Sequence, residues 1–156
     1  MTFPYQIVKG IGEDYKIYQR TLPWIPVTIF NPAKPNKSIT VLCLADTGSD
    51  QTFFTTEIGI YLGFDIAKGI VSKLYGIGGG QQTVYYFKEV GIKISDPTNK
   101  ELPIEFVDSM GFTSESFPLQ SPQQTGILGT VGFFRNVNML FNYPKEMRLT
   151  INKNLN

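Results

Sequence analysis

Glycine, proline and asparagine divide this chain into short β-prone runs. The runs are residues 24–30, 38–45, 69–75, 83–94, 102–108, 136–142 and 147–151. Several of them alternate apolar and polar residues with a period of two, which is the pattern of a half-buried strand. We therefore expect a mainly β protein.

Two polar stretches are predicted to connect strands. Residues 31–38 carry two prolines and two asparagines between two β-prone runs, which indicates a hairpin connection. Residues 108–126 are rich in serine, glutamine and proline, and we expect a long surface loop there.

Helical character is confined to two short segments. In residues 55–64, Thr55 or Thr56 is placed to cap a helix of about two turns and Gly63 to end it. The second segment is 130–136. The chain is thus expected to contain one or two short helices.

Length and composition exclude several classes of protein. A chain of 156 residues supports one hydrophobic core. The net charge of +1 provides no field that would recruit nucleic acid or an anionic membrane. One cysteine, Cys43, and no histidine exclude a disulfide framework, the usual metal and haem ligands and a Ser-His-Asp site. We expect no metal and no cofactor.

The first residues lack the basic flank and continuous apolar core of a signal peptide. No stretch approaches the 18 or so apolar residues of a membrane span. The expected location is therefore cytoplasmic, with no membrane partner.

A carboxylate follows directly on a buried-looking run in the sequence VLCLADTGSD, residues 41–50. Asp46 has two readings here: a turn-forming acid at a strand end, or an acid placed for chemistry. The motif alone does not decide between them.

A glycine-rich stretch, KLYGIGGGQQ, occupies residues 73–82 between two β-prone runs. It is typical of a hairpin tip whose backbone changes conformation easily and approaches a ligand closely. A plain hairpin and a nucleotide-binding loop are the alternatives. The nucleotide-binding alternative lacks both a following helix and a Gly-Lys-Ser/Thr cradle.

A third segment, TGILGTVGFFRN at 125–136, contains an apolar pair ending in Gly129. Taken alone, it indicates core packing in which Gly129 permits a close backbone crossing.

The three segments together resemble the retropepsin family, the single-domain aspartic proteases of retroviruses and their cellular relatives. An apolar-apolar-Asp-Thr-Gly-Ser-Asp run, a Gly-Ile-Gly-Gly hairpin and an Ile-Leu-Gly segment follow one another in the order and spacing of that family. The resemblance covers about residues 24–151. It implies a single-domain retropepsin-like acid protease barrel, active as a homodimer. Residues 1–23 form an N-terminal extension of unknown role, and 24–156 form the protease domain.

The resemblance also implies the chemistry. Two carboxylates a few ångströms apart share one proton, so one acts as base toward a water while the other protonates the carbonyl of a peptide bond. This chain supplies one such aspartate, Asp46, and a second copy must supply the other. The partners are then a second copy and a peptide or protein substrate, with no nucleic acid.

Site residues follow from the same resemblance. Asp46 is the catalytic carboxylate, Thr47 links the two active-site loops across the dimer axis, and Gly48 lets the loops approach. Asp50 and Gln51 hold the substrate backbone, and the glycine-rich flap closes over it. The expected catalytic residues are Asp46, Thr47 and Gly48, and the expected substrate-binding residues are Ser49, Asp50, Gln51, Tyr75, Gly76, Ile77, Gly78 and Gly79.

Ser49 prompts a further hypothesis. A hydroxyl that donates to the ionised carboxylate lowers the apparent pKa of the dyad, which predicts an acidic working range. Substrate specificity is expected to be apolar. The family pattern places Tyr75, Ile104, Phe106 and Ile127 near the substrate pockets, although core packing explains each of them more simply.

One position departs from the family pattern. Viral members commonly have Gly-Arg after the apolar pair, and that arginine pairs with the acid that is Asp50 here. This chain has Gly129-Thr130, so either Arg135 substitutes or Asp50 has no partner.

Two alternatives to the protease stay open. A module with the same fold could bind a peptide strand or dimerise without cutting. The motifs could also occur by chance in an unrelated β-barrel binding protein.

Overall fold

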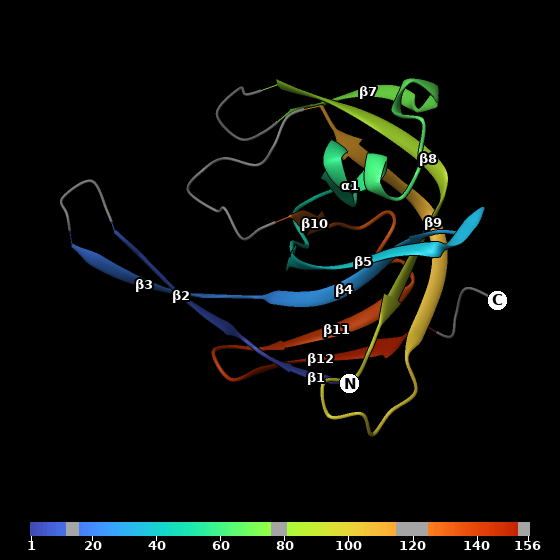
Figure 1. Cartoon of the computed structure of the whole chain (residues 1–156). Coiled ribbons are helices and arrows are strands. Elements are labelled where there is room, and N and C mark those ends of the chain that lie inside the picture. Colours follow the sequence, from blue (N-terminus) through green and yellow to red (C-terminus); the bar gives the residue numbers. More distant parts are fainter. Residues whose placement is uncertain (12–15, 76–80, 115–124, 153–156) are drawn as a thin grey trace.

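Strands make up most of the protein (Figure 1). The computed structural model describes residues 1–11, 16–75, 81–114 and 125–152. The elements are β1 (Thr2–Pro4), β2 (Gln6–Ile11), β3 (Ile17–Leu22), β4 (Trp24–Asn31), β5 (Lys34–Ala45), β6 (Phe53–Thr55), α1 (Thr56–Tyr61), the 3₁₀-helix η1 (Ile66–Lys68), β7 (Ile70–Tyr75), β8 (Gln81–Ile94), β9 (Ile104–Thr113), β10 (Gly126–Leu128), β11 (Val137–Asn142) and β12 (Glu146–Ile151). The prediction of a mainly β protein is confirmed.

The largest sheet closes on itself. Its seven strands follow the order β4-β5-β10-β6-β9-β8-β7, and β4 also pairs with β8. The additional pairing joins the sheet into a ring of six strands, with β7 extending beyond it, which is the barrel expected from the sequence. The β4–β5 pair is an antiparallel hairpin, as the composition of 31–38 predicts.

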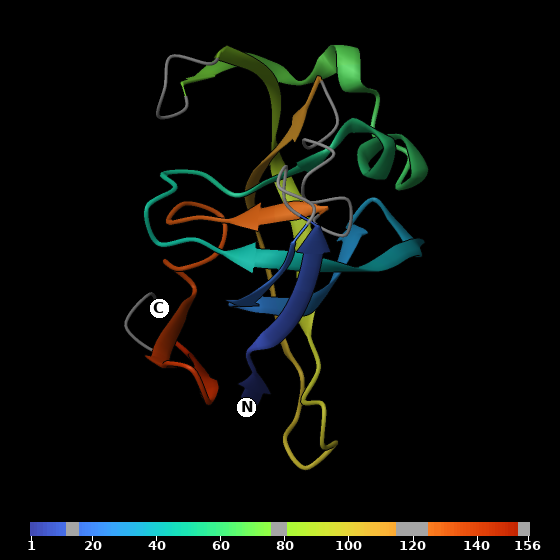
Figure 2. The ribbon, with the colours of Figure 1, turned by 90° about the vertical axis from the view of Figure 1, so that its left-hand side faces the viewer.

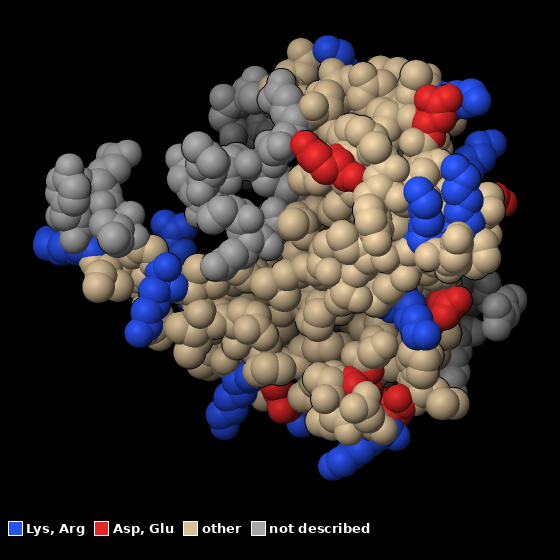
Figure 3. Space-filling model, viewed as in Figure 1, with Lys and Arg blue, Asp and Glu red and all other residues tan. Residues whose placement is uncertain are grey.

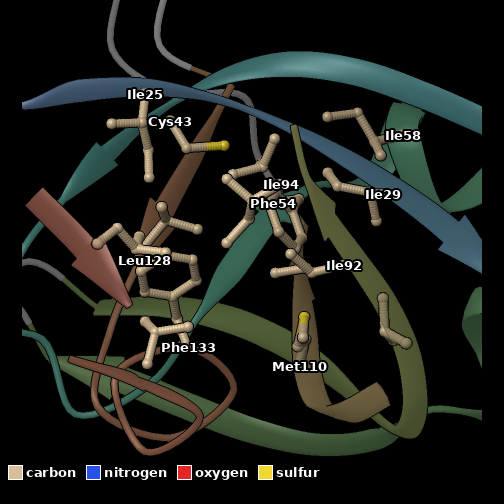
Figure 4. Close-up of a cluster of buried hydrophobic side chains, with 14 of the residues drawn as sticks. Ile25, Ile29, Cys43, Phe54, Ile58, Ile92, Ile94, Met110, Leu128 and Phe133 are labelled. Atoms are coloured by element: carbon tan, nitrogen blue, oxygen red, sulfur yellow. The ribbon is translucent and has the colours of Figure 1, made fainter. Parts of the chain in front are cut away.

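Alternating side chains of the barrel strands fill its interior. On β4 the inward residues are Ile25, Val27 and Ile29, each at most 1% exposed. Figure 4 shows Ile25 and Ile29 facing Cys43, Phe54, Ile92, Ile94, Met110, Leu128 and Phe133 across this core. Burial of such side chains is the main stabilising contribution to a fold of this kind.

The helix expected within 55–64 is present as α1. Thr55 is its N-cap residue, and Gly63 ends it with a φ of +79°, a conformation that glycine adopts without a steric penalty. The buried side of α1 presents Ile58 to the core.

Two expectations on irregular segments are corrected. Residues 108–113 are not loop, because they form the second half of β9 and pair with β8 and β6. Residues 130–136 are not a helix. Gly132, with a φ of +92°, interrupts helical geometry, and Phe134 N donates to Gly129 O in a wide turn. Residues 115–124 lie outside the described part of the chain.

Residues 1–23 contribute to two smaller sheets. β1 pairs with β12, which pairs with β11, and Phe3 belongs to the main core cluster. β2 and β3 form a two-stranded sheet of their own that extends from the body (Figure 1). The division of the chain at residue 23 stays a prediction.

Charged side chains of both signs are interspersed over the face shown in Figure 3. Among the described residues, no helix has the length and apolar character needed to cross a bilayer.

Candidate active site

Asp46 lies where β5 ends beside β10. The two strands are parallel neighbours, with Leu128 of β10 level with Ala45 of β5. The backbone amide of Asp46 donates to Leu128 O at 3.0 Å, so the strand pairing continues to the first residue of the loop. Because β5 and β10 are barrel strands, the backbone of Asp46 is fixed by the core of the molecule.

The carboxylate of Asp46 closes the turn that follows. Gly48 N donates to Asp46 Oδ1 at 3.0 Å, and Ser49 N donates to the Asp46 carbonyl at 3.1 Å. Asp46 is half-buried, whereas Thr47 and Gly48 are exposed. Among the described residues nothing hydrogen-bonds to Oδ2. Asp46 is therefore a turn-forming acid that closes its turn through Oδ1.

Residues 46–52, the Asp46 loop, are clamped along their length by residues 129–131. Thr130 N donates to Ser49 O, and Val131 N donates to Asp50 O, both at 2.9 Å. Gln51 and Val131 form a parallel bridge. The structure thus joins two of the three segments that carry the family resemblance.

Thr52 locks the end of this loop to Gly129. Its Oγ1 accepts a hydrogen bond from Gly129 N at 2.9 Å and donates to Gly129 O at 3.3 Å. Thr52 is fully buried, so both bonds are shielded from water. Sequence reasoning did not single out Thr52, although it lies only six positions after Asp46.

Gly129 is required by the closeness of the two segments. A Cβ atom at this position would lie 2.2 Å from Gln51 O and 2.7 Å from Ser49 O, which are backbone atoms. The sequence-based expectation of a close backbone crossing at Gly129 is confirmed. Its partner in the crossing is the Asp46 loop.

The Ser49 hydroxyl has an acceptor other than a carboxylate. Ser49 Oγ donates to Gln51 O at 2.8 Å. A hydroxyl carries a single proton, so in this arrangement Ser49 does not donate to Asp46. The hydrogen bond that the pH hypothesis requires is absent here.

Arg135 is held by Asp108. Arg135 Nε and Nη2 both donate to the Asp108 carboxylate, and Asn136 Nδ2 donates to Asp108 Oδ2 at 2.6 Å. The Asp108 side chain is 5% exposed. Of the two possibilities for Asp50, substitution by Arg135 is excluded in this structure. Asp50 is exposed and forms no ion pair with any described residue.

Asp108 ends the β-prone run 102–108 and begins the expected loop 108–126, so the sequence analysis does not place it in the interior of a strand. A period-two signal was nevertheless present in the sequence. Ile104, Phe106, Asp108, Met110 and Phe112 are alternate residues of β9, and all are buried or partly buried. A single acid on the inner face of a strand requires cationic or hydrogen-bonding partners.

The remaining expected substrate-binding residues are only partly described. Gln51 is half-buried, and Tyr75, at the end of β7, is 75% exposed. Tyr75 pairs with Gln81, so β7 and β8 form the expected hairpin. Its tip, with Gly76, Ile77, Gly78 and Gly79, lies outside the described residues.

The expected pocket residues divide between core and surface. Ile104 and Phe106 pack against the main core, and the Phe106 ring lies 6.2 Å from that of Phe133. Ile127 is half-buried on β10. For Ile104 and Phe106 the core explanation accounts for the contacts.

Cys43 lies on β5, three residues before Asp46. Cys43 is fully buried, and burial raises the pKa of its thiol far above the ordinary value. In the described ranges, no three Asp, Glu or Cys side chains converge as metal ligands would.

The sequence matches no protein-family model and no curated protein. One solved structure that it is similar to is a retropepsin-like aspartic protease from Rickettsia conorii. The two chains share 13% sequence identity with a TM-score of 0.49, over 92% of this chain and 98% of the other.

Proposed function

We propose that this protein is an aspartic endopeptidase in which two copies each contribute Asp46 to one catalytic pair. The observation that supports the proposal is the clamped Asp46 loop. The half-buried Asp46 carboxylate, at the end of a barrel strand, accepts a hydrogen bond from Gly48 N, and the loop that carries it is held by Thr130 N and Val131 N. Fixed backbone geometry of this kind is what positioning of a catalytic group requires.

The proposed reaction is hydrolysis of a peptide bond in an extended segment. One carboxylate of the pair takes a proton from water, whose oxygen attacks the peptide carbonyl carbon. The other carboxylic acid donates its proton to the carbonyl oxygen. Collapse of the tetrahedral intermediate breaks the C–N bond and transfers a proton to the leaving amine. No cofactor takes part in these steps.

Each Asp46 has a free oxygen for this role. Oδ1 is occupied by Gly48 N, while Oδ2 has no donor among the described residues. Two such loops related by a two-fold axis would place identical oxygens opposite each other. Thr47 and Gly48, both exposed beside Asp46, are the residues through which we expect the two loops to touch.

Cleavage of a peptide library by the wild-type protein, read by mass spectrometry between about pH 3.5 and about pH 7, tests the proposal. We expect cuts between apolar residues that are absent with Asp46→Asn. The matched control is Asp65→Asn, which removes an exposed carboxylate whose ion-pair partner in the described part of the chain is the exposed Lys68. Cleavage that survives Asp46→Asn would refute the proposal.

A mixing experiment tests the shared site. If every active unit needs two Asp46 carboxylates, added Asp46→Asn protein exchanges into mixed dimers and lowers the activity of the wild type. Asp65→Asn added in the same ratio should not lower it. Binding of peptides without cleavage by a dimeric preparation would favour the alternative, a peptide-binding module with the same fold.

A further inference from the structure

The β2–β3 hairpin is not part of either larger sheet. Its six register pairs run from Gln6↔Leu22 to Ile11↔Ile17, and neither outer edge pairs with another described strand. A lone two-stranded hairpin is at best marginally stable in water. A hairpin of this length therefore needs a surface to pack against.

Both faces of this hairpin expose apolar side chains. Ile7 and Ile17 lie on one face, at 62% and 74% exposed, and Tyr18 lies on the other at 48%. On β3, the four residues from Ile17 to Arg20 are all exposed. Ile7 and Ile17 lie on a face that also carries Lys9 and Gln19, and they are the exposed apolar side chains of this face that association would cover.

The base of the hairpin lies beside Asp46. β3 ends at Leu22, and the carbonyl of the next residue, Pro23, accepts a hydrogen bond from Ala45 N at 2.9 Å. Ala45 is the residue before Asp46. The hairpin therefore begins at Leu22, one residue before Pro23, which hydrogen-bonds the last residue of β5.

From this base the hairpin extends beyond the end of β5. β4 and β5 are antiparallel, and β3 leads into β4, so the hairpin projects in the direction in which β5 points (Figure 1). Six residues of strand span about 20 Å. Figure 2 looks onto this side of the molecule, where the blue hairpin comes toward the viewer.

A second copy that brings its own Asp46 within a few ångströms must occupy the space in front of this loop. That space is flanked by the projecting hairpin. We propose that the β2–β3 hairpin is an arm that packs against the second copy of this chain and buries Ile7 and Ile17 there. This inference rests on the proposed function, because the need for a second Asp46 is what identifies the occupant.

The proposal also assigns a role to β2 and β3. The family resemblance assigns them none, because it begins at about residue 24. Each copy would hold its partner by one arm, so both arms contribute across one two-fold axis. The contact would lie next to the Asp46 loops and couple assembly to completion of the site.

The test is the dissociation constant of the dimer, measured by sedimentation of the full chain. We expect the double variant Ile7→Lys/Ile17→Lys to raise this constant at least tenfold, because two charged groups replace buried apolar contacts. The matched control is Ile70→Lys/Val71→Lys. These two side chains on β7 are each 61% exposed, and β7 is the outermost strand of the barrel sheet. We expect the control to change the constant less than twofold.

A second measurement keeps the test valid if the lysines loosen the hairpin itself. In the wild type, hydrogen exchange of the β2 and β3 amides should slow as protein concentration rises through the dimer range. The proposal would be overturned if hydrogen exchange of these amides did not depend on protein concentration but slowed when peptide was added at a fixed protein concentration. That result would identify substrate as the occupant. A hairpin variant that dimerises like wild type would also overturn it.

The outcomes separate the arm from the enzyme. If the hairpin variant cleaves peptides once its concentration exceeds its raised dissociation constant, both proposals stand. If it dimerises normally and cleaves, the arm proposal fails while the proposed function remains. If the wild type never dimerises, the arm proposal fails outright. If Asp46→Asn still cleaves, the proposed function fails whatever the arm does.

Discussion

Arg135 forms a salt bridge with the buried carboxylate of Asp108, which ties the 129–136 turn to β9. The same turn holds the Asp46 loop through Thr130 and Val131. The 129–136 turn is therefore joined to β9 by the ion pair and to the Asp46 loop by backbone hydrogen bonds. Arg135 is therefore not the partner of the exposed Asp50.

We expect Arg135→Met to lower the free energy of unfolding by about 1 to 3 kcal/mol, because Asp108 loses its main charged donor while it stays buried. The expected loss is moderate because the Arg135 side chain is 47% exposed, so water screens part of its interaction with Asp108. Denaturant unfolding measures the change. Arg148→Met removes a pair between Arg148 and Glu146 at the surface, and should cost at most about 0.5 kcal/mol. Equal losses for the two variants would contradict this role of Asp108.

The candidate site could be predicted in part. The Asp-Thr-Gly-Ser motif indicates the loop, and Gly129 indicates a close backbone crossing, but the sequence does not identify the Asp46 loop as the partner in that crossing. Asp108 could not be located in the same way, since serine, glutamine and proline downstream suggested a loop across 108–126. The partner of Arg135 depends on pairing between distant segments, which local pattern does not reveal.

Gly129→Ala is expected to damage both stability and activity. The added methyl group would meet the Gln51 carbonyl at 2.2 Å, and a backbone atom cannot move aside without shifting the Asp46 loop. We expect a loss of about 1 to 3 kcal/mol in unfolding free energy and, on the proposed function, about 100-fold in kcat/KM. Gly10→Ala, where a methyl group meets nothing within 4 Å, is the control for unfolding free energy alone, because Gly10 lies on the proposed arm. Wild-type activity in Gly129→Ala would show that the loop tolerates displacement.

Thr52→Val tests the lock at the end of the loop. Valine keeps the shape of threonine but leaves Gly129 N without its acceptor in a buried place, which should cost about 1 to 3 kcal/mol. Thr52→Ser, which keeps the hydroxyl, should recover most of this loss in thermal or denaturant unfolding. In Thr28→Val, an exposed Thr28–Thr40 hydroxyl pair is lost, and stability should change by less than about 0.5 kcal/mol. A Thr52→Ser variant as unstable as Thr52→Val would show that packing, not the hydroxyl, matters.

The fold was predictable where one face of a strand is buried. β4 and β8 are long enough for alternation to be visible, and their runs were identified within a few residues. β6 and β10 have three residues each, too few to show a period. β2 and β3 gave no signal for a different reason. Only Gln6, Val8, Thr21 and Leu22 of that hairpin are partly buried among the described residues, so its strands have no long buried side to show a period.

Ser49→Ala is expected to leave the acid limb of the pH–rate profile in place. The reason is that Ser49 Oγ donates to Gln51 O and does not reach Asp46 as a donor in this structure. The variant should instead show lower activity at every pH, because the Asp46 loop loses an internal bond. The profile of kcat/KM against pH for both proteins makes the comparison. A shift of the acid limb to higher pH would restore the hypothesis drawn from the sequence.

Asp96 should make folding stability depend on pH. The hydrogen bond from the Thr98 hydroxyl, followed by backbone amides of Thr98, Lys100 and Glu101, holds the pKa of Asp96 below its ordinary value of 3.8. A carboxyl whose pKa is lower in the folded state stabilises fully above the unfolded pKa, and this contribution is lost as pH falls below about 4. Thr98→Val removes the largest cause, so the variant should be less stable than the wild type at about pH 7, and the difference should close only as pH falls through the folded pKa of Asp96, well below 3.8.

Thr98→Ser is the control for that comparison, since it keeps the hydroxyl that donates to Asp96 Oδ2. Unfolding is to be measured at one fixed protein concentration, because dimerisation would add its own contribution to stability. A gap between Thr98→Val and wild type that stays constant from neutral to acid pH would mean that packing of the threonine methyl group, not the charge on Asp96, stabilises this turn. This turn links β8 to β9, and β9 carries Asp108, the partner of Arg135. In that case the charge on Asp96 would not contribute to holding β9 in place.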